Sequence, residues 1–133
     1  MARDDIKTML TGIIALTATT NAALSAGQVN GEIIDLQGET GGAFLVSIPA
    51  ITGGALAVGI EHGDDPTLSD AAAVTDPYHI DGLIEVGEAG TYGLGYYGIK
   101  RYIRLTTTPV GTVTGASAFA TYASCKQDRG ALS

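Results

Sequence analysis

The sequence predicts an all-β protein, an antiparallel β-sandwich that resembles a jelly roll and is preceded by an extended N-terminal arm. Large aromatic residues are scarce, with no Trp and two Phe, whereas Gly occurs 19 times in 133 residues. Runs rich in β-branched and aromatic residues recur roughly every eight to twelve residues, separated by Gly-rich turns. Apolar and polar residues alternate within several runs, as expected for half-buried strands. The length suits a single domain.

The first 28 residues are predicted to form an arm and connector that dock outside the sandwich. Residues 9–18 mix β-branched and small apolar residues, which favours a strand. Residues 17–28 are rich in Thr, Ala, Ser and Gly. Such a connector is typical of flexible or extended chain. The apolar run 8–18 is about half the length of a membrane span, so we expect no membrane partner. Residues 29–133 then form the sandwich domain.

The sandwich is built in order from short strands. Strands are expected at 31–36, 43–48, 55–61, 78–86, 91–98, 100–107 and 116–124. Pro49 is expected to end the second strand, because proline cannot donate to a ladder. An Asp-rich turn at 62–66 leads to a return strand at 68–74. The alternative there is a short helix capped by Asp65, with Pro66 at its first position.

Alternation in residues 99–105 assigns Ile99, Arg101, Ile103 and Leu105 to one face, which is the more apolar and should point inward. Arg101 would then need a carboxylate or carbonyl partner. We expect one of the acids of residues 61–88, or alternatively a position at the sheet rim.

The chain has a net charge of −7, and its charged residues are distributed unevenly along the sequence. Residues 61–88 contain eight acidic residues and no Lys or Arg, while all basic residues lie within 3–7 or 100–129. This asymmetry indicates one surface that attracts a partner and another that repels it, or simply solvated loops. The basic flank therefore either contacts a partner or neutralises the acidic middle. The overall acidity argues against a nucleic-acid partner.

Candidate chemistry is sparse. Glu61, Asp64, Asp65 and Asp70 offer oxygen ligands, but their spacing does not match an EF-hand loop, and Asp also favours turns. The single Cys125 excludes an internal disulfide, and no zinc spacing is present. The Gly-rich run 90–98 precedes a strand instead of a helix, so it is not a phosphate loop. We expect no metal and no cofactor.

The histidines His62 and His79 have no nucleophile elbow near them in the sequence. We therefore expect no catalytic residue. A histidine hydrogen-bonded to a serine in a deep cleft would contradict that expectation.

The order of several short pieces resembles a family of small tailed-bacteriophage virion proteins. The first piece is Asp35-Leu36-Gln37-Gly38, followed by the runs at 43–48, 51–54, 60–65 and 70–74, and by the run from Tyr97 to Leu105. The similarity covers about residues 30–123 and depends on order and spacing. Glu39-Thr40 departs from the aromatic–acid pair expected after Gln-Gly.

The resemblance implies a capsid decoration (cement) protein that binds the outer surface of the assembled head, bridges capsid subunits and forms a small homo-oligomer, a dimer or trimer. Its main partner would be the major capsid protein. The alternatives are a head–tail connector or tail-tube protein, or a carbohydrate-binding module for host adsorption. The partner interface is expected to include Arg3, Ile6, Lys7, Leu10, Ile13, Lys100 and Arg104.

Overall fold

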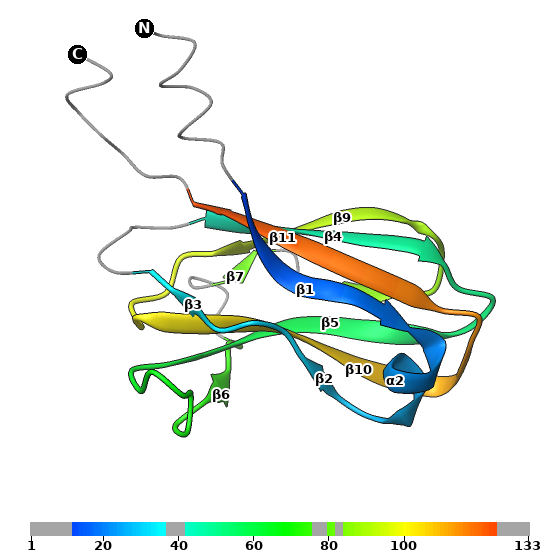
Figure 1. The fold of residues 1–133 in the computed structure, drawn as a ribbon, viewed down its shortest axis with the longest axis horizontal. Helices are drawn as coiled ribbons and strands as arrows, with labels where there is room; N and C mark the ends of the chain where they lie inside the picture. The colour runs from blue at the N-terminus through cyan, green and yellow to red at the C-terminus, as the bar shows by residue number, and fades with distance from the viewer. Residues whose placement is uncertain (1–11, 37–41, 76–79, 82–83, 125–133) are drawn as a thin grey trace, which may run out of the picture.

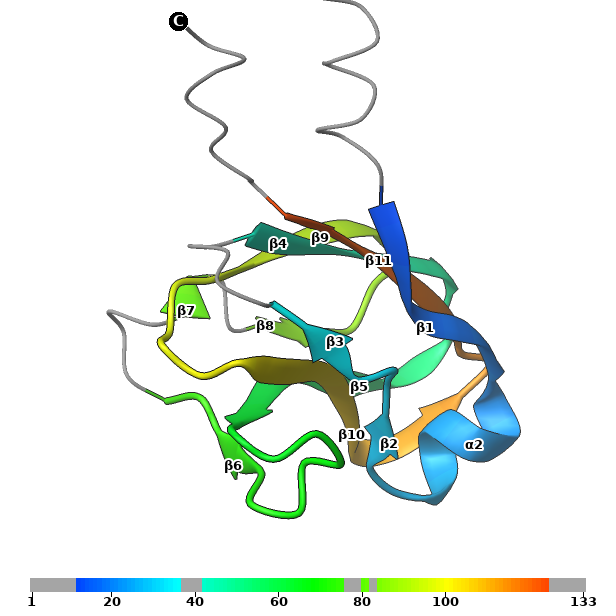
Figure 2. The same ribbon diagram turned by 60° about the vertical axis from the view of Figure 1, so that its left-hand side comes forward.

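The computed structural model describes residues 12–36, 42–75, 80–81 and 84–124, in which two antiparallel sheets pack face to face (Figures 1 and 2). The first sheet has the order β1 (Gly12–Thr20), β11 (Ser117–Ser124), β4 (Gly42–Ala50), β9 (Gly90–Tyr96) and β7 (Ile80–Asp81). The second has the order β2 (Val29–Asn30), β10 (Tyr102–Thr114), β5 (Gly53–Gly63) and β6 (Ala72–Ala73). Two short strands complete it, because β3 (Ile34–Asp35) also pairs with β10 and β8 (Ile84–Val86) also pairs with β5.

The strand order is that of a jelly roll. The first strand of the described chain lies beside the last, and the chain passes repeatedly from one sheet to the other between β3 and β11. The predicted all-β sandwich is therefore confirmed.

The core lies between the sheets and follows the period-two pattern of the strands. In β4, Phe44, Val46 and Ile48 are buried while Leu45 is exposed. In β11, Tyr122 points inward and packs against Phe44 with ring centroids 4.9 Å apart. Each inward side chain removes apolar surface from water, which is the main favourable term in folding. The outward side chains of the same strands stay available for other contacts.

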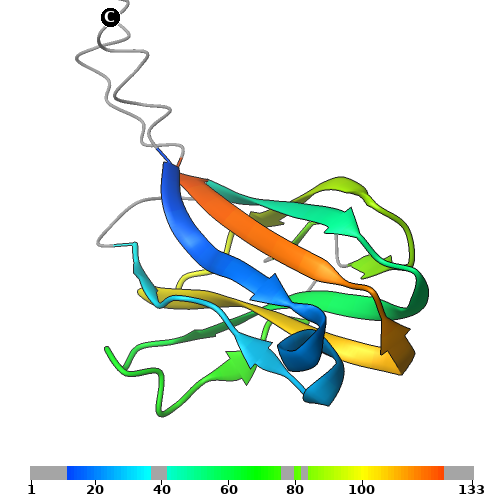
Figure 3. The same ribbon diagram turned by 45° about the vertical axis from the view of Figure 1, so that its right-hand side comes forward.

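The N-terminal arm was predicted wrongly for residues 12–28. These residues are part of the sandwich, because β1 pairs with β11 from Gly12↔Ala123 to Thr20↔Ser117, as Figure 3 shows for the blue and orange strands. The sandwich therefore already includes Gly12 instead of starting at residue 29. Residues 1–11, the rest of the predicted arm, lie outside the described residues.

The predicted flexible connector contains a helix, α2 (Asn21–Ala26), which closes one end of the sandwich. Leu24 is fully buried there. Asn21 anchors the start of α2, because its Oδ1 accepts a hydrogen bond from the Ala116 N–H at 3.0 Å. The helix carries the chain from β1 in the first sheet to β2 in the second.

Gly31 lies where the chain passes close to both sheets. Its N–H donates to the Leu105 carbonyl at 2.7 Å, and the next N–H, of Glu32, donates to the Ala15 carbonyl at 2.7 Å. A Cβ on Gly31 would collide with the Ala15 carbonyl oxygen. The absence of a side chain therefore permits this close approach.

Two further expectations are corrected. Pro49 does not end its strand, since β4 runs to Ala50 with an irregularity in its pairing to β11 around Pro49; proline is tolerated at such a bulge. The segment after the Asp-rich turn forms only the two-residue strand β6, and Leu68 adopts a positive φ of 54°. Neither a long return strand nor a helix forms there.

Candidate functional site

Charged side chains gather on the second sheet, where β3, β10 and β5 lie side by side. Arg104 on β10 faces Glu61 on β5, and its Nη2 lies 2.7 Å from Glu61 Oε1. Arg101, just before β10, donates from Nε and Nη2 to the two oxygens of Asp35 on β3, both at 2.9 Å. The hydrogen bonds and charge of Asp35 raise the pKa of Arg101. Each ion pair joins segments far apart in the sequence.

Arg101 does not point into the core, which corrects the prediction from alternation. Its side chain is half exposed and also lies over the ring of Tyr102, 5.2 Å from the centroid. Its acidic partner, Asp35, lies outside residues 61–88. Period two applies only within a strand, and β10 begins at Tyr102. Ile103 and Leu105 are buried as predicted, whereas Ile99 and Arg101 precede the strand.

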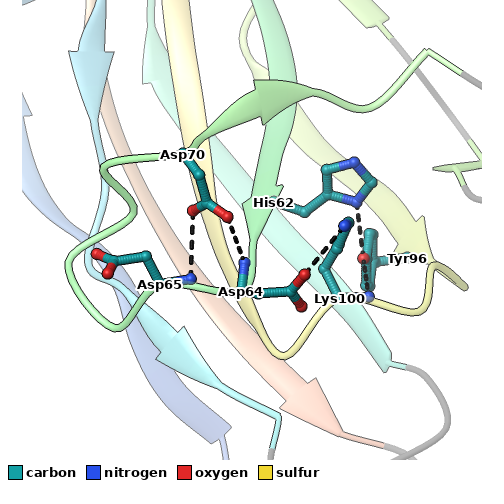
Figure 4. Close-up of polar contacts among 6 residues, drawn as sticks. All are labelled: His62, Asp64, Asp65, Asp70, Tyr96 and Lys100. Carbon is teal, nitrogen blue, oxygen red and sulfur yellow. Dashed lines mark hydrogen bonds and ion pairs between the residues drawn. The ribbon is translucent and has the colours of Figure 1, made fainter.

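The Asp-rich turn is held by its own carboxylates (Figure 4). The two oxygens of Asp70 accept hydrogen bonds from the N–H groups of Asp64 and Asp65, at 2.9 and 3.2 Å. Asp65 Oδ2 accepts from the hydroxyl and the N–H of Thr67. These bonds lower the pKa of Asp65 from 3.8 to about 2, the Thr67 hydroxyl contributing most. The amide of Asp64 is the main cause that lowers the pKa of Asp70.

The segment is therefore a turn held by its own side chains, as predicted from the sequence. Its carboxylates are directed at backbone amides, which is the usual role of Asp in turns. Among the described residues no group of three or more His, Cys, Asp or Glu is arranged to hold a metal ion. In the same part of the chain no helix is long and apolar enough to cross a membrane.

Next to this turn, a polar contact joins the two sheets. The Nδ1 of His62 on β5 lies 2.8 Å from the hydroxyl of Tyr96 on β9. The two rings are arranged edge to face, with their centroids 5.7 Å apart. The Lys100 N–H donates to the same hydroxyl at 3.3 Å, while Lys100 Nζ lies 3.0 Å from Asp64 Oδ2. Figure 4 shows Lys100 reaching from one group to the other. Burial is the main cause that raises the pKa of Tyr96.

Among the described residues, His62 has the hydroxyl of Tyr96 as a hydrogen-bond partner. His79 lies outside the described residues. The contact links β5 of one sheet to β9 of the other, so its evident effect is to fix the sheets at this end of the sandwich.

A hollow of about 440 Å³ lies over the outer face of β5 and β10. The small residues Ala57 and Gly59 contribute to its lining, together with Glu61 and Glu85. Glu61 already has Arg104 as its partner. The hollow therefore presents small side chains and backbone, with carboxylates at its border.

The predicted interface residues separate into three groups. Arg3, Ile6, Lys7 and Leu10 lie outside the described residues. Ile13 is half exposed on β1. Lys100 and Arg104 form ion pairs with Asp64 and Glu61 of the acidic middle, as expected if the basic flank neutralises that region. Asp35 was not recognised as the partner of Arg101, because nothing in the sequence indicates that Tyr102 pairs with Asp35 across β10 and β3.

No family model matches the sequence, and no curated protein matches it. Among solved structures, a similar one is the crystal structure of the SPBc2 prophage-derived protein YomS, with a TM-score of 0.44 and 13% sequence identity over 86% of this chain and 91% of that chain. That protein is derived from a prophage. At this level of similarity no role passes from it to this chain.

Proposed function

We propose that this protein is a structural component of a tailed-phage particle, a capsid decoration protein that binds the outer surface of the assembled head. The first support is the ordered resemblance of residues 30–123 to small virion proteins. The second is that charged residues of those matching pieces bind one another in the folded chain.

Charged residues of the matching pieces bind one another. Asp35 of the first piece pairs with Arg101 of the last, and Glu61 of a middle piece pairs with Arg104. Asp70 holds the turn at Asp64 and Asp65. These contacts join β3 and β5 to β10 or its start and hold the Asp-rich turn, which suits a protein whose role is to make contacts in an assembly.

One structural observation carries the shell-binding proposal: both terminal segments join the sandwich at the same corner. Gly12 pairs with Ala123 where β1 begins and β11 ends, and Figure 3 shows the two strand ends together. Residues 1–11 include Arg3, Ile6, Lys7 and Leu10, and residues 125–133 add two more basic residues. An eleven-residue segment can span up to about 36–40 Å when extended.

We infer that residues 1–11 attach the sandwich to neighbouring capsid subunits. A decoration protein that binds only the assembled shell stabilises it by mass action, because opening the shell must also break its contacts. Apolar residues in the segment would contribute burial, at about 25 cal/mol per Å², and Arg3 and Lys7 would contribute electrostatic attraction.

The test uses expanded phage heads that lack the protein. The full chain is added, and bound copies are measured by cosedimentation and by the heat needed to open the shell. We expect binding and a raised opening temperature. A variant lacking residues 2–11 should bind weakly or not at all. The paired variants Ile6→Ser/Leu10→Ser and Arg3→Glu/Lys7→Glu separate apolar from electrostatic attachment.

Two outcomes would contradict the proposal. One is failure of the full, folded chain to bind heads at any salt concentration. The other is immunogold labelling of intact particles at the tail or the head–tail junction, which would favour a tail-tube or connector protein. Removal of residues 126–133 is the matched control, because it shortens the other segment at the same corner.

A further inference from the structure

The outer face of the first sheet differs from the rest of the described surface. Its four long strands, β1, β11, β4 and β9, contain no Asp, Glu, Lys, Arg or His. Elsewhere, the described side chains include eight acidic and three basic residues. These are Glu32, Asp35, Glu61, Asp64, Asp65, Asp70, Glu85 and Glu88, with Lys100, Arg101 and Arg104. Charge is thus separated between the four strands and the remainder of the sandwich.

Large apolar side chains are exposed on this uncharged face. Ile14 is 60% exposed, Leu45 55% and Phe119 43%. The register places Thr121 between Ile14 and Leu45, because Thr121 pairs with Ile14 on one side and with Leu45 on the other. Phe119 pairs with Ser47, two residues along from Leu45. The three apolar residues therefore form one cluster across β1, β11 and β4.

Small residues surround this cluster. Ala43 and Ala123 pair with each other and are exposed, and Gly93 pairs with Leu45 on its other side. Three large side chains next to low-lying Ala and Gly positions give a surface with both projections and shallow depressions. Such a surface can be complementary to a copy of itself related by a two-fold axis.

We propose that this face is the interface between two copies of the chain, which pack sheet against sheet to form a dimer. The net charge of −7 favours this arrangement over others. Two acidic molecules repel each other, and contact through the uncharged sheets keeps the acidic second sheets on opposite outer sides of the dimer. No charged side chain of the four strands has to be desolvated on association.

The size of the face predicts a reversible dimer. Four strands spaced about 4.8 Å apart and about eight residues long, at about 3.3 Å per residue, cover on the order of 500 Å². A standard stable interface buries about 800 Å² per partner. We therefore expect dissociation to be measurable in the micromolar range, not a permanent dimer. The association requires no phage particle, so it is independent of the proposed function.

Analytical ultracentrifugation of the full chain tests the proposal, with reducing agent present because Cys125 could cross-link copies. The wild-type mass should rise from one chain to two as concentration rises from low to high micromolar. Leu45→Lys and Thr121→Lys, in the centre of the face, should each raise the dissociation constant by roughly tenfold or more. Added salt should strengthen the wild-type dimer by screening repulsion, whereas it would weaken an interface held by ion pairs.

Ile99→Lys is the matched control. Ile99 is an apolar residue that is 85% exposed and lies in the loop between β9 and β10, so its replacement should leave dimerisation unchanged. Thermal unfolding of each variant establishes that it is folded. A wild-type chain that stays monomeric at high micromolar concentration overturns the proposal. If the wild-type chain is monomeric and Leu45→Lys abolishes head binding, the face contacts the capsid instead of a second copy. Equal effects of Ile99→Lys and Leu45→Lys on the dissociation constant would also overturn the dimer.

Discussion

Arg104 and Glu61 lie directly opposite each other on β10 and β5, and the guanidinium Nε and Nη2 lie 2.8 and 2.7 Å from the same carboxylate oxygen. Their side chains are 19% and 18% exposed. The pair is therefore largely shielded from water, unlike Arg101–Asp35, whose side chains are 50% and 38% exposed. Shielding makes an ion pair costly to break, because the remaining charge loses its partner in a poorly solvated position.

Replacing one member of the shielded pair should destabilise the fold. Glu61→Gln or Arg104→Met is expected to lower the free energy of unfolding by about 1–3 kcal/mol. The double variant should cost less than the sum of the two single variants. Urea denaturation measures these values. Asp35→Asn is the control for an exposed pair and should cost about 0–1 kcal/mol. Equal losses at both pairs would show that shielding has no effect.

The Asp-rich turn should make stability depend on pH in the acidic range. The pKa of Asp65 is lowered from 3.8 to about 2 in the folded chain, mainly by the hydroxyl of Thr67. Because the pKa is lower in the folded chain, the ionised carboxylate adds to the free energy of unfolding above about pH 4. This added stability is lost as the pH falls toward about 2. Asp65→Asn should reduce the loss of stability over this window.

Carboxyl NMR titration measures the same effect directly. Thr67→Val removes the hydroxyl donor and keeps the Thr67 N–H, so the pKa of Asp65 should move back toward 3.8. A wild-type Asp65 that titrates at its ordinary value would contradict the hydrogen bonds assigned to this turn.

A buried hydroxyl offers a stabilising substitution. Thr107 on β10 is fully buried, and among the described residues its Oγ1 has no hydrogen-bond partner. Burial of a hydroxyl without a hydrogen-bond partner costs free energy, because the hydroxyl loses its hydrogen bonds to water and gains none in the fold. Thr107→Val should raise the free energy of unfolding by roughly 1 kcal/mol. Thr108→Val, at the exposed neighbouring position, should change it by less than about 0.5 kcal/mol. Calorimetry compares the two, and a lower Tm for Thr107→Val would contradict the prediction.

Strands with a clear apolar alternation were predictable from the sequence. The expected strand 43–48 lies within β4, whose inward residues are Phe44, Val46 and Ile48, and 55–61 lies within β5. The expected strand 116–124 contains β11, whose alternation is also matched by burial, with Ala118, Ala120 and Tyr122 buried and Phe119 exposed. In these strands the local pattern and the packing agree, because one side of each strand faces the core.

Features that depend on distant partners were not predictable. The run 12–20 has the composition of a connector as well as that of a strand, and it becomes β1 because β11, about a hundred residues later, provides its ladder. The ion pair Arg101–Asp35 likewise depends on the register between β10 and β3. The uncharged face was not recognised because its four strands are scattered through the sequence and become neighbours only in the folded sheet.

Two truncations distinguish β1 as a strand of the sandwich from β1 as a detachable arm. Deletion of residues 2–24 removes β1 and the buried residues Ala15, Leu16 and Leu24, and leaves β11 without its neighbour. Burial of each leucine alone is worth about 1.5–3 kcal/mol, a large part of a typical stability of about 5–15 kcal/mol. This variant should be unfolded by circular dichroism and by amide NMR dispersion. Deletion of residues 2–11 keeps β1 and should unfold cooperatively with a near-normal Tm. A folded product of the longer deletion would show that the sandwich does not need β1, and that the pairing of β1 with β11 contributes little to its stability.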